Sequence, residues 1–359
     1  MSRYDLTPEH RARMADWAAW WTAHALRTDS MTEDDRDAMR VAIAGLYAAA
    51  GLPPPTAIVF AAGPVSAARA AGYAAGIWWL REHPERHVEL FGRALGQEDY
   101  VAAVAALCRH CAMGAEVRAA TWAAMEDAIS DAIDDALGAA TARPTEGRSD
   151  EITSSIMRDS TAAEVWAATW EPTAAETWDA TSGAAEIATR DATASATWRE
   201  SNDRVYHFSW REVQIATRDA TDHETADATW RATLGAPSPT ATGDLGPLAT
   251  FLSACAAQSY RMRSGGSEWA GHAAFISFFR YVVQLPIDYA GWEHYEQAAL
   301  HGASRWMHSR FVIVADRPEY IRMDDEHRLH CTDGPARRDR DGYKHWYVHG
   351  MRAQKEGST

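Results

Sequence analysis

The sequence predicts a mainly α protein of the α+β class, and three observations support this prediction. Residues 1–115 contain segments of helical length that end at glycine or proline, which is typical of a helical domain. Residues 116–234 repeat a four-residue unit, and residues 248–309 again have helical length and composition. Residues 310–353 change to short alternating segments with an Asp-Gly turn signal, which predict a small antiparallel β-hairpin module.

The N-terminal segment predicts several packed helices and one short strand. Apolar segments at Asp16–Leu26 and Asp34–Ala50 are the first two helices, and Gly51 ends the second. A brief strand is expected at Ile58–Phe60. Gly63-Pro64 then starts a helix rich in small residues, because proline is favoured in the first turn of a helix. The N-terminus of that helix follows a strand and could face an anion.

Composition and charge limit the classes of partner. The chain has 359 residues, of which 47% are apolar and sixteen are tryptophan, so it can bury a large core. Its formal net charge is -15 and its pI is about 5.4. Because the molecule as a whole repels a phosphate backbone, a nucleic-acid partner is disfavoured. A protein or small-molecule partner fits the composition better.

The same sequence indicates a cytoplasmic protein. The N-terminal residues are charged, which is not typical of a signal peptide. The most apolar run, 57–80, contains Pro64 and Arg69, so we expect no membrane span. Four cysteines in a chain of this length do not form a disulfide framework. We therefore expect a reduced protein in the cytoplasm.

A four-residue repeat, Ala-Thr-Trp-Asp with substitutions, runs through the middle of the chain. From Thr121 to Thr233, seventeen of the twenty-nine residues at every fourth position are threonine. The residue after this position is tryptophan in seven cases: Trp122, Trp166, Trp170, Trp178, Trp198, Trp210 and Trp230. A repeating unit of this kind is typical of a scaffold or a binding surface.

Two structures agree with a four-residue period. On an α-helix, four residues turn through 400°. The residues at one position of the repeat, which we call a column, therefore advance around the helix by about 40° per repeat. Helices of about sixteen to twenty residues can still hold one column near one face. On a β-solenoid, Ala and Trp would face one side and Thr and Asp the other. We favour helices. The tryptophan column is then either part of the core or an exposed stacking surface for a carbohydrate, peptide or aromatic ligand.

Short motifs are spread over nearly the whole chain. They are LTPE (Leu6 to Glu9), LY-x-x-AGL-x-PP (Leu46 to Pro55), FISFFR (Phe275 to Arg280) and a closing RP…D…RLH…GPA…DG…HG (Arg317 to Gly350). Together with the tetrad repeats, they resemble an uncharacterised bacterial domain family that is most common in actinobacteria. The resemblance implies an architecture and no established activity.

Histidines and a cysteine cluster in the C-terminal hairpin region. A two-residue turn at Asp341-Gly342 would place Arg338 opposite His345 and would bring His330, Cys331 and His349 to one end. His345 would lie about 7 Å away from them. Zinc needs three or four converging N, S or O ligands. His330, Cys331 and His349 are therefore candidate ligands of zinc or another transition metal, and the alternative is an ordinary hairpin rich in histidine.

The second candidate metal site is Cys108-Arg-His-Cys111. On a helix, two thiols at positions i and i+3 lie on one face, as half of a metal site or a redox pair would require. The chain has no second C-x-x-C, so small buried residues on an alanine-rich helix are the alternative for Cys108 and Cys111.

The sequence supports two hypotheses of function. The first is a non-enzymatic interaction protein that binds a partner through its repeat surface or its C-terminal hairpin. The second is an enzyme, with or without a metal, whose site lies between the hairpin and the adjacent helices and uses His330 and His349 as catalytic residues. The sequence predicts neither the substrate nor the oligomeric state.

Overall fold

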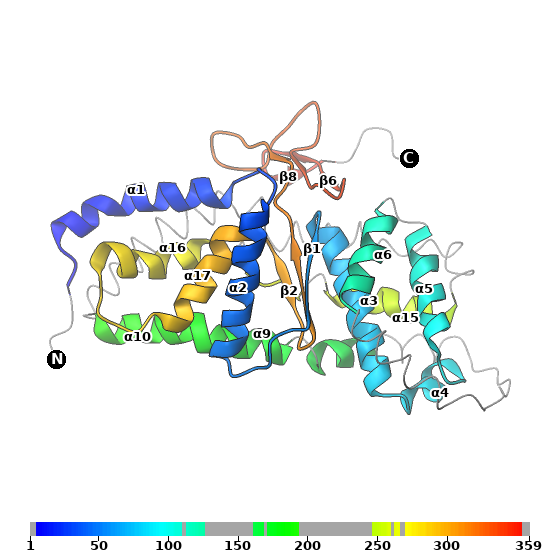
Figure 1. Cartoon of the computed structure of the whole chain (residues 1–359). Coiled ribbons are helices and arrows are strands. Elements are labelled where there is room, and N and C mark those ends of the chain that lie inside the picture. Colours follow the sequence, from blue (N-terminus) through cyan, green and yellow to red (C-terminus); the bar gives the residue numbers. More distant parts are fainter. Residues whose placement is uncertain are drawn as a thin grey trace.

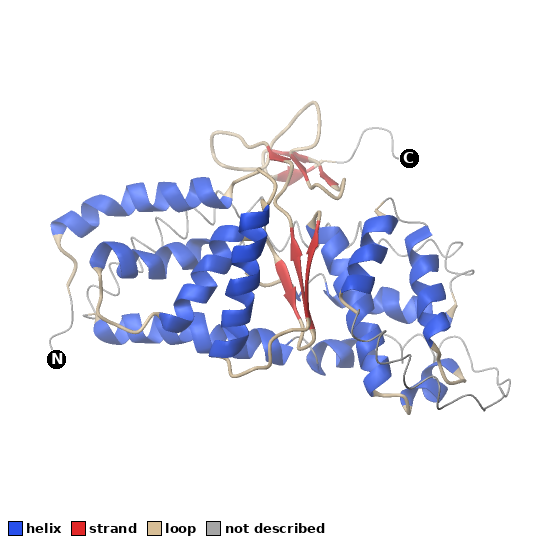
Figure 2. Ribbon diagram, viewed as in Figure 1, coloured by secondary structure: helices blue, strands red, loops and turns tan. Residues whose placement is uncertain are grey.

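The computed structural model describes residues 5–109, 113–125, 161–168, 171–193, 246–259, 262–265 and 270–353. Within these ranges the chain is mainly helical with small sheets, which confirms the predicted mainly α (α+β) class. Two groups of helices lie on either side of a central three-stranded sheet, and the short C-terminal strands lie at one end of it (Figure 2). Across the described ranges, we find no helix with the length and apolar character that crossing a membrane requires.

The central sheet joins segments from the two ends of the chain. Its strands are β1 (Ala57–Ala61), β3 (Phe311–Ala315) and β2 (Arg305–Met307), in that order; β1 is parallel to β3, and β2 is antiparallel to it. The expected strand at Ile58–Phe60 is therefore present within β1. Side chains of β3 alternate between the two helical groups and are buried on both faces, which explains the continuous apolar run FVIVA.

One helical group covers the first face of the sheet. It contains α1 (Pro8–Ala25), α2 (Glu33–Ala49), α16 (Ala270–Phe278), the π-helix η5 (Phe279–Val283) and α17 (Ala290–His301). Figure 1 shows these helices on the left of the sheet. Thr7 and Thr32 cap α1 and α2, each through a capping box with the third helical residue. Their shared core includes Leu46, Phe275, Ile276, Phe278, Trp292 and Val314.

The second helical group covers the opposite face. It contains α3 (Pro64–Glu82), α4 (Arg86–Phe91), α5 (Gln97–Arg109), α6 (Gly114–Ala123) and α15 (Pro247–Ser259), which lie on the right in Figure 1. Helix α3 is buried on nearly all sides, as its small apolar residues predict. Gly72 lies against the backbone of Ala256, and a Cβ there would collide with it. The pair α3 and α15 therefore packs at close range because of this glycine.

The described parts of the tetrad region are helical. They are α6, residues 161–168, and a continuous helix built from α9 (Glu171–Trp178), the π-helix η1 (Asp179–Gly183) and α10 (Ala184–Ala192). The threonine column is buried throughout these parts, from Thr121 and Thr161 to Thr193. Buried threonine hydroxyls donate to the carbonyl four residues earlier, as Thr177 does to Thr173 at 2.9 Å. The hydroxyls are thus satisfied within their own helix.

The π-helix explains how one helix keeps this column on a single face. Four residues exceed an α-helical turn by about 40° but fall short of a π-helical turn of about 4.4 residues by a similar angle. The threonine column rotates around the helix axis in one direction along α9, and the π turn at η1 rotates it back. As a result Thr173, Thr181 and Thr189 are all at most 5% exposed, although they span more than four turns.

The described tryptophans of the repeat are half-buried. Trp122 and Trp166 pack against the core of α3, and Trp178 packs against the core of α17. Trp170, Trp198, Trp210 and Trp230 lie outside the residues whose side chains the structure describes. The three described indoles support the core interpretation of this column.

Five short strands form the C-terminal module: β4 (Tyr320–Ile321), β5 (Arg337–Arg338), β6 (Lys344–His345), β7 (Tyr347–Val348) and β8 (Met351–Arg352). The predicted hairpin turn is present, but its register was wrong by one residue, because Arg338 pairs with Lys344. Gly342 has φ +88°, and its N–H donates to the Asp339 carbonyl. The connection is therefore a three-residue loop with a left-handed glycine, which shifts the pairing relative to a two-residue turn.

Candidate metal centre

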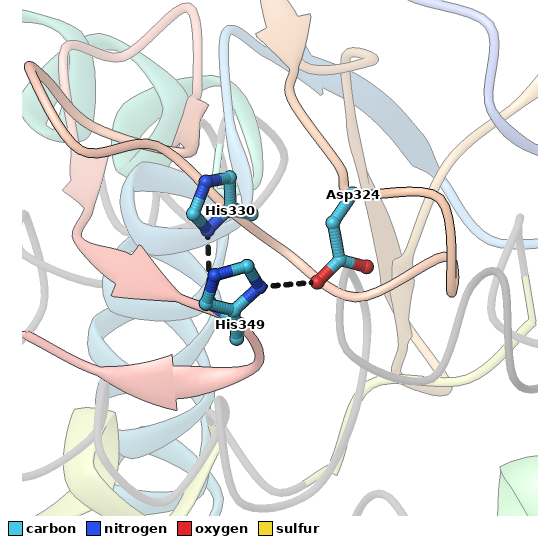
Figure 3. Close-up of side chains that lie close together, drawn as sticks. All are labelled: Asp324, His330 and His349. Atoms are coloured by element: carbon cyan, nitrogen blue, oxygen red, sulfur yellow. Dashed lines mark hydrogen bonds and ion pairs between the residues drawn. The ribbon is translucent and has the colours of Figure 1, made fainter.

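Three side chains of the C-terminal module converge on one point: Asp324, His330 and His349 (Figure 3). One donor atom from each lies within 4.8 Å of the other two. The imidazoles of His330 and His349 stack, with ring centroids 4.0 Å apart. The two histidines predicted from the sequence thus meet, and the third member, Asp324, is not among the residues predicted from the sequence.

A tight loop holds Asp324 in place. Its carboxylate Oδ1 accepts the backbone N–H groups of Glu326 at 3.2 Å and Arg328 at 2.9 Å. His327 closes the loop in the left-handed region, with φ +59°. The two flanking residues, Met323 and Leu329, form a β-bridge. These bonds fix Oδ1 toward the backbone and direct Oδ2 toward the histidines.

His349 lies in the turn between β7 and β8. His349 and Gly350 have φ values of +48° and +74°, as the two central residues of a type I′ turn require. A non-glycine residue with positive φ is uncommon, although asparagine, aspartate and histidine adopt it more often than other residues. Unusual backbone conformations of this kind are concentrated at functional sites. The turn carries the imidazole to the surface, where its side chain is 52% exposed.

Hydrogen bonds define the protonation of the two imidazoles. Of the two polar contacts of His349 Nδ1, the one with Asp324 Oδ2 is the shorter, at 2.8 Å against 3.2 Å for Arg328, and because a carboxylate only accepts, we assign a proton to this nitrogen. His330 Nδ1 accepts the backbone N–H of His349 at 3.1 Å, so the proton of neutral His330 is on Nε2. A metal ion bound here would take the place of the proton between Asp324 and His349, and would use the Nδ1 lone pair of His330 in place of the His349 N–H.

Arg328 is the competitor of a metal ion at this position. Its Nη2 lies 2.7 Å from Asp324 Oδ2 and 3.2 Å from His349 Nδ1. Hydrogen bonds from Arg328 and then His349 hold the pKa of Asp324 well below its ordinary value, although burial opposes them. The carboxylate is therefore ionised at neutral pH and ready to act as a ligand. A metal ion must displace the guanidinium of Arg328.

The other candidate residues lie elsewhere. The Cys331 thiol donates to Asp333 Oδ1 at 3.1 Å and accepts from Arg322 Nη1 at 3.0 Å, away from the two histidines. His345 is buried, with Nε2 2.9 Å from Asp339 Oδ2. Burial of this imidazole lowers its pKa despite the contact with Asp339. Both residues therefore serve the interior of the module.

The Cys108 and Cys111 pair is only partly described. Cys108 is buried in α5, within the core that includes α3 and α15. Cys111 lies outside the described residues. A metal or redox role of this pair stays a prediction.

The donor set fits a borderline transition metal. Zinc binds imidazole nitrogen and carboxylate oxygen at about 2.0–2.2 Å, so its ligand atoms lie about 3.4 Å apart. The donor atoms of the three side chains lie within 4.8 Å of one another, so they would have to approach by roughly an ångström to bind zinc. Two histidines and one carboxylate leave coordination positions open to water or to another protein.

Comparison with known proteins gave no match: no family model fits the chain, and no curated protein or solved structure is significantly similar to it. The resemblance to an actinobacterial family stays a prediction. The geometry of this site is therefore the basis for assigning a function.

Proposed function

We propose that this chain is a non-catalytic binding protein whose C-terminal β module holds a transition metal ion, with zinc as the best-fitting ion. The observation that supports this proposal is the convergence of Asp324, His330 and His349. Catalytic sites are normally concave and exclude water, whereas His349 is 52% exposed on a surface turn. An exposed ion with open coordination positions suits the capture of a ligand atom from a protein partner.

The test is a titration of the metal-free chain with zinc in competition with a chromophoric chelator. We expect one equivalent to bind with a Kd in the micromolar range, because three partly exposed ligands give moderate affinity. His349→Asn keeps a residue that suits the left-handed turn but removes the imidazole, so it should lose at least about tenfold to 100-fold in affinity. His330→Ala should lose a similar factor.

Two matched variants complete the design. His327→Asn makes the same exchange at another left-handed position of the module, where the imidazole is exposed and outside the cluster, and should bind zinc as the wild type does. Arg328→Gln removes the competing cation and should bind zinc more tightly. Stoichiometric binding that survives both His330→Ala and His349→Asn would contradict the proposed site, as would the absence of binding to the wild type.

A further inference from the structure

A second polar feature lies deep in the molecule, where β2 meets α9 and α17. Arg305 is the first residue of β2 and is only 3% exposed. Its backbone pairs with Val314 of β3 on one side and with Ser264 on the other. The next residue, Trp306, faces the helical group that contains α3. Because side chains alternate along a strand, Arg305 and Met307 face the other helical group, which contains α2 and α17.

The guanidinium of Arg305 has no anionic partner among the described residues. Its Nε and Nη1 atoms are buried without a hydrogen-bond acceptor. The groups that act on it electrostatically are two tyrosines, Tyr295 and Tyr47, and it lies 5.9 Å from the centre of the Tyr295 ring. The other buried arginine of this region, Arg317, forms ion pairs with two aspartates. Arg305 is thus a buried cation that lacks a counter-charge among the residues that the structure describes.

The guanidinium borders a cavity of about 50 Å³. Apolar and aromatic side chains line most of it, including Leu46, Ala174, Trp178 and Met307. Gly265 leaves the space that Nη1 occupies, since a Cβ at this residue would collide with that atom. One water molecule needs about 10–15 Å³ measured in this way, so the cavity has room for about three or four water-sized groups.

These properties define the chemistry of an occupant. A guanidinium cannot lose its proton in a protein, and a buried charge is strongly unfavourable unless an opposite charge compensates it. A carboxylate matches the planar fork of arginine with two parallel hydrogen bonds. A dianion such as phosphate would leave a net negative charge in an apolar cavity, so a monoanion fits better.

We propose that this cavity is a binding site for a small carboxylate monoanion. Its carboxylate pairs with Arg305, and a short aliphatic group lies against Leu46, Trp178 and Met307. The site is independent of the metal centre, because it is built from β2, α2, α9 and α17 rather than from the C-terminal module.

The experiment compares thermal unfolding of the full chain in acetate and propionate with unfolding in chloride at equal pH and ionic strength. A ligand of this size binds with a Kd between about 50 μM and about 10 mM. At about a hundredfold excess over Kd, the carboxylates should raise the Tm by about 3–5 °C relative to chloride. Calorimetric titration with acetate should give one site.

Three variants test the assignment to this cavity. Arg305→Met keeps the volume but removes the charge, and Ala174→Val fills part of the cavity without changing any charge. Both variants should have the same Tm in carboxylate as in chloride. Arg310→Met changes an arginine that is 50% exposed on the adjacent turn and should respond as the wild type does. Equal Tm values in acetate and chloride for the wild type, or a carboxylate response that persists in Arg305→Met, would overturn the proposal.

Discussion

Replacing Asp35 with alanine is expected to lower the free energy of unfolding by about 3–5 kcal/mol, because the change leaves a buried arginine without its main partner. Asp35 is 7% exposed and Arg317 is 5% exposed, and Arg317 Nη1 donates to Asp35 Oδ2 at 3.2 Å. His301 Nδ1 lies 2.9 Å from Asp35 Oδ1. Asp29, which is half exposed, is the only other carboxylate that pairs with Arg317 among the described residues.

The network has a role in the architecture. Asp35 also accepts the N–H of Thr32 and so completes the capping box of α2. Arg317 follows the carboxyl end of β3, where Asp316 accepts the N–H of Met31 at 2.8 Å. These bonds hold the loop between α1 and α2 against the end of the central sheet. Loss of Asp35 therefore weakens both a helix cap and a contact between the two ends of the chain.

The matched control is Asp37→Ala on the exposed face of the same helix, where the ion pair with Arg40 contributes at most about 0.5 kcal/mol. Urea unfolding followed by circular dichroism measures both variants. The Asp35→Ala, Arg317→Met double variant should recover part of the loss, because it removes both buried charges. A loss below about 1 kcal/mol for Asp35→Ala would show that the ion pair does not stabilise the fold.

The pH dependence of this contribution has a definite sign. Burial opposes ionisation of Asp35, but hydrogen bonds from Arg317, His301 and Thr32 outweigh it and hold the pKa well below its ordinary value of 3.8. Stability from a depressed carboxylate pKa is present above the pKa of the unfolded chain and is lost as the pH falls through the folded value. The wild type should therefore lose this contribution only below about pH 4.

The helical segments and the hairpin could be predicted from sequence because their signals are local. The capping residues, the Asp-Gly dipeptide and the apolar runs each act within a few positions. The hairpin register could not, since the same dipeptide fits both two-residue and three-residue loops. The π turn at η1 also lacked a signal, because its residues, Asp179 to Gly183, match the repeat that forms α-helix on either side.

Contacts between distant parts of the chain were beyond the sequence pattern. Pairing of β1 with β3 joins residues about 250 positions apart, and no local feature names the partner. Counting residues from the hairpin turn was enough to predict that His330 lies near His349. Asp324 was missed because its carboxylate reaches the histidines only when the loop 324–328 folds back. That Arg305 has no anionic partner within the described ranges is visible only once the surrounding helices are in place.

Asp341→Asn is expected to change the pH dependence of stability in the opposite sense to Asp35. Asp341 Oδ2 accepts the N–H of Val65 at 3.2 Å and of Ser66 at 3.0 Å, so it caps α3 from the C-terminal module. The anion expected at this helix N-terminus is thus a side chain of the same protein. Gly63 leaves room for this carboxylate, because a Cβ at residue 63 would lie too close to it.

Protonation of this carboxylate is favoured by its surroundings. Burial, followed by the charge of Asp339, raises the pKa of Asp341 to about 6 from an ordinary value of 3.8, and Glu116 adds to the effect, while the N–H groups of Ser66 and Tyr343 oppose it. A carboxyl whose folded pKa is raised contributes stability below the unfolded pKa and loses it as the pH rises through the folded pKa. Between pH 4.5 and pH 7.5 this loss amounts to about 2 kcal/mol.

The measurement is the free energy of unfolding of the wild type and Asp341→Asn at those two pH values. Asparagine can still accept from the α3 backbone but does not ionise, so the variant should gain about 2 kcal/mol relative to the wild type as the pH rises. Asp325→Asn changes an exposed residue of the same module, and its free energy of unfolding should change with pH as that of the wild type does. If the free energy of unfolding of Asp341→Asn relative to the wild type were the same at both pH values, or fell as the pH rises, the N–H groups of α3 would outweigh burial at Asp341. The carboxylate would then hold the C-terminal module on α3 most firmly at neutral pH.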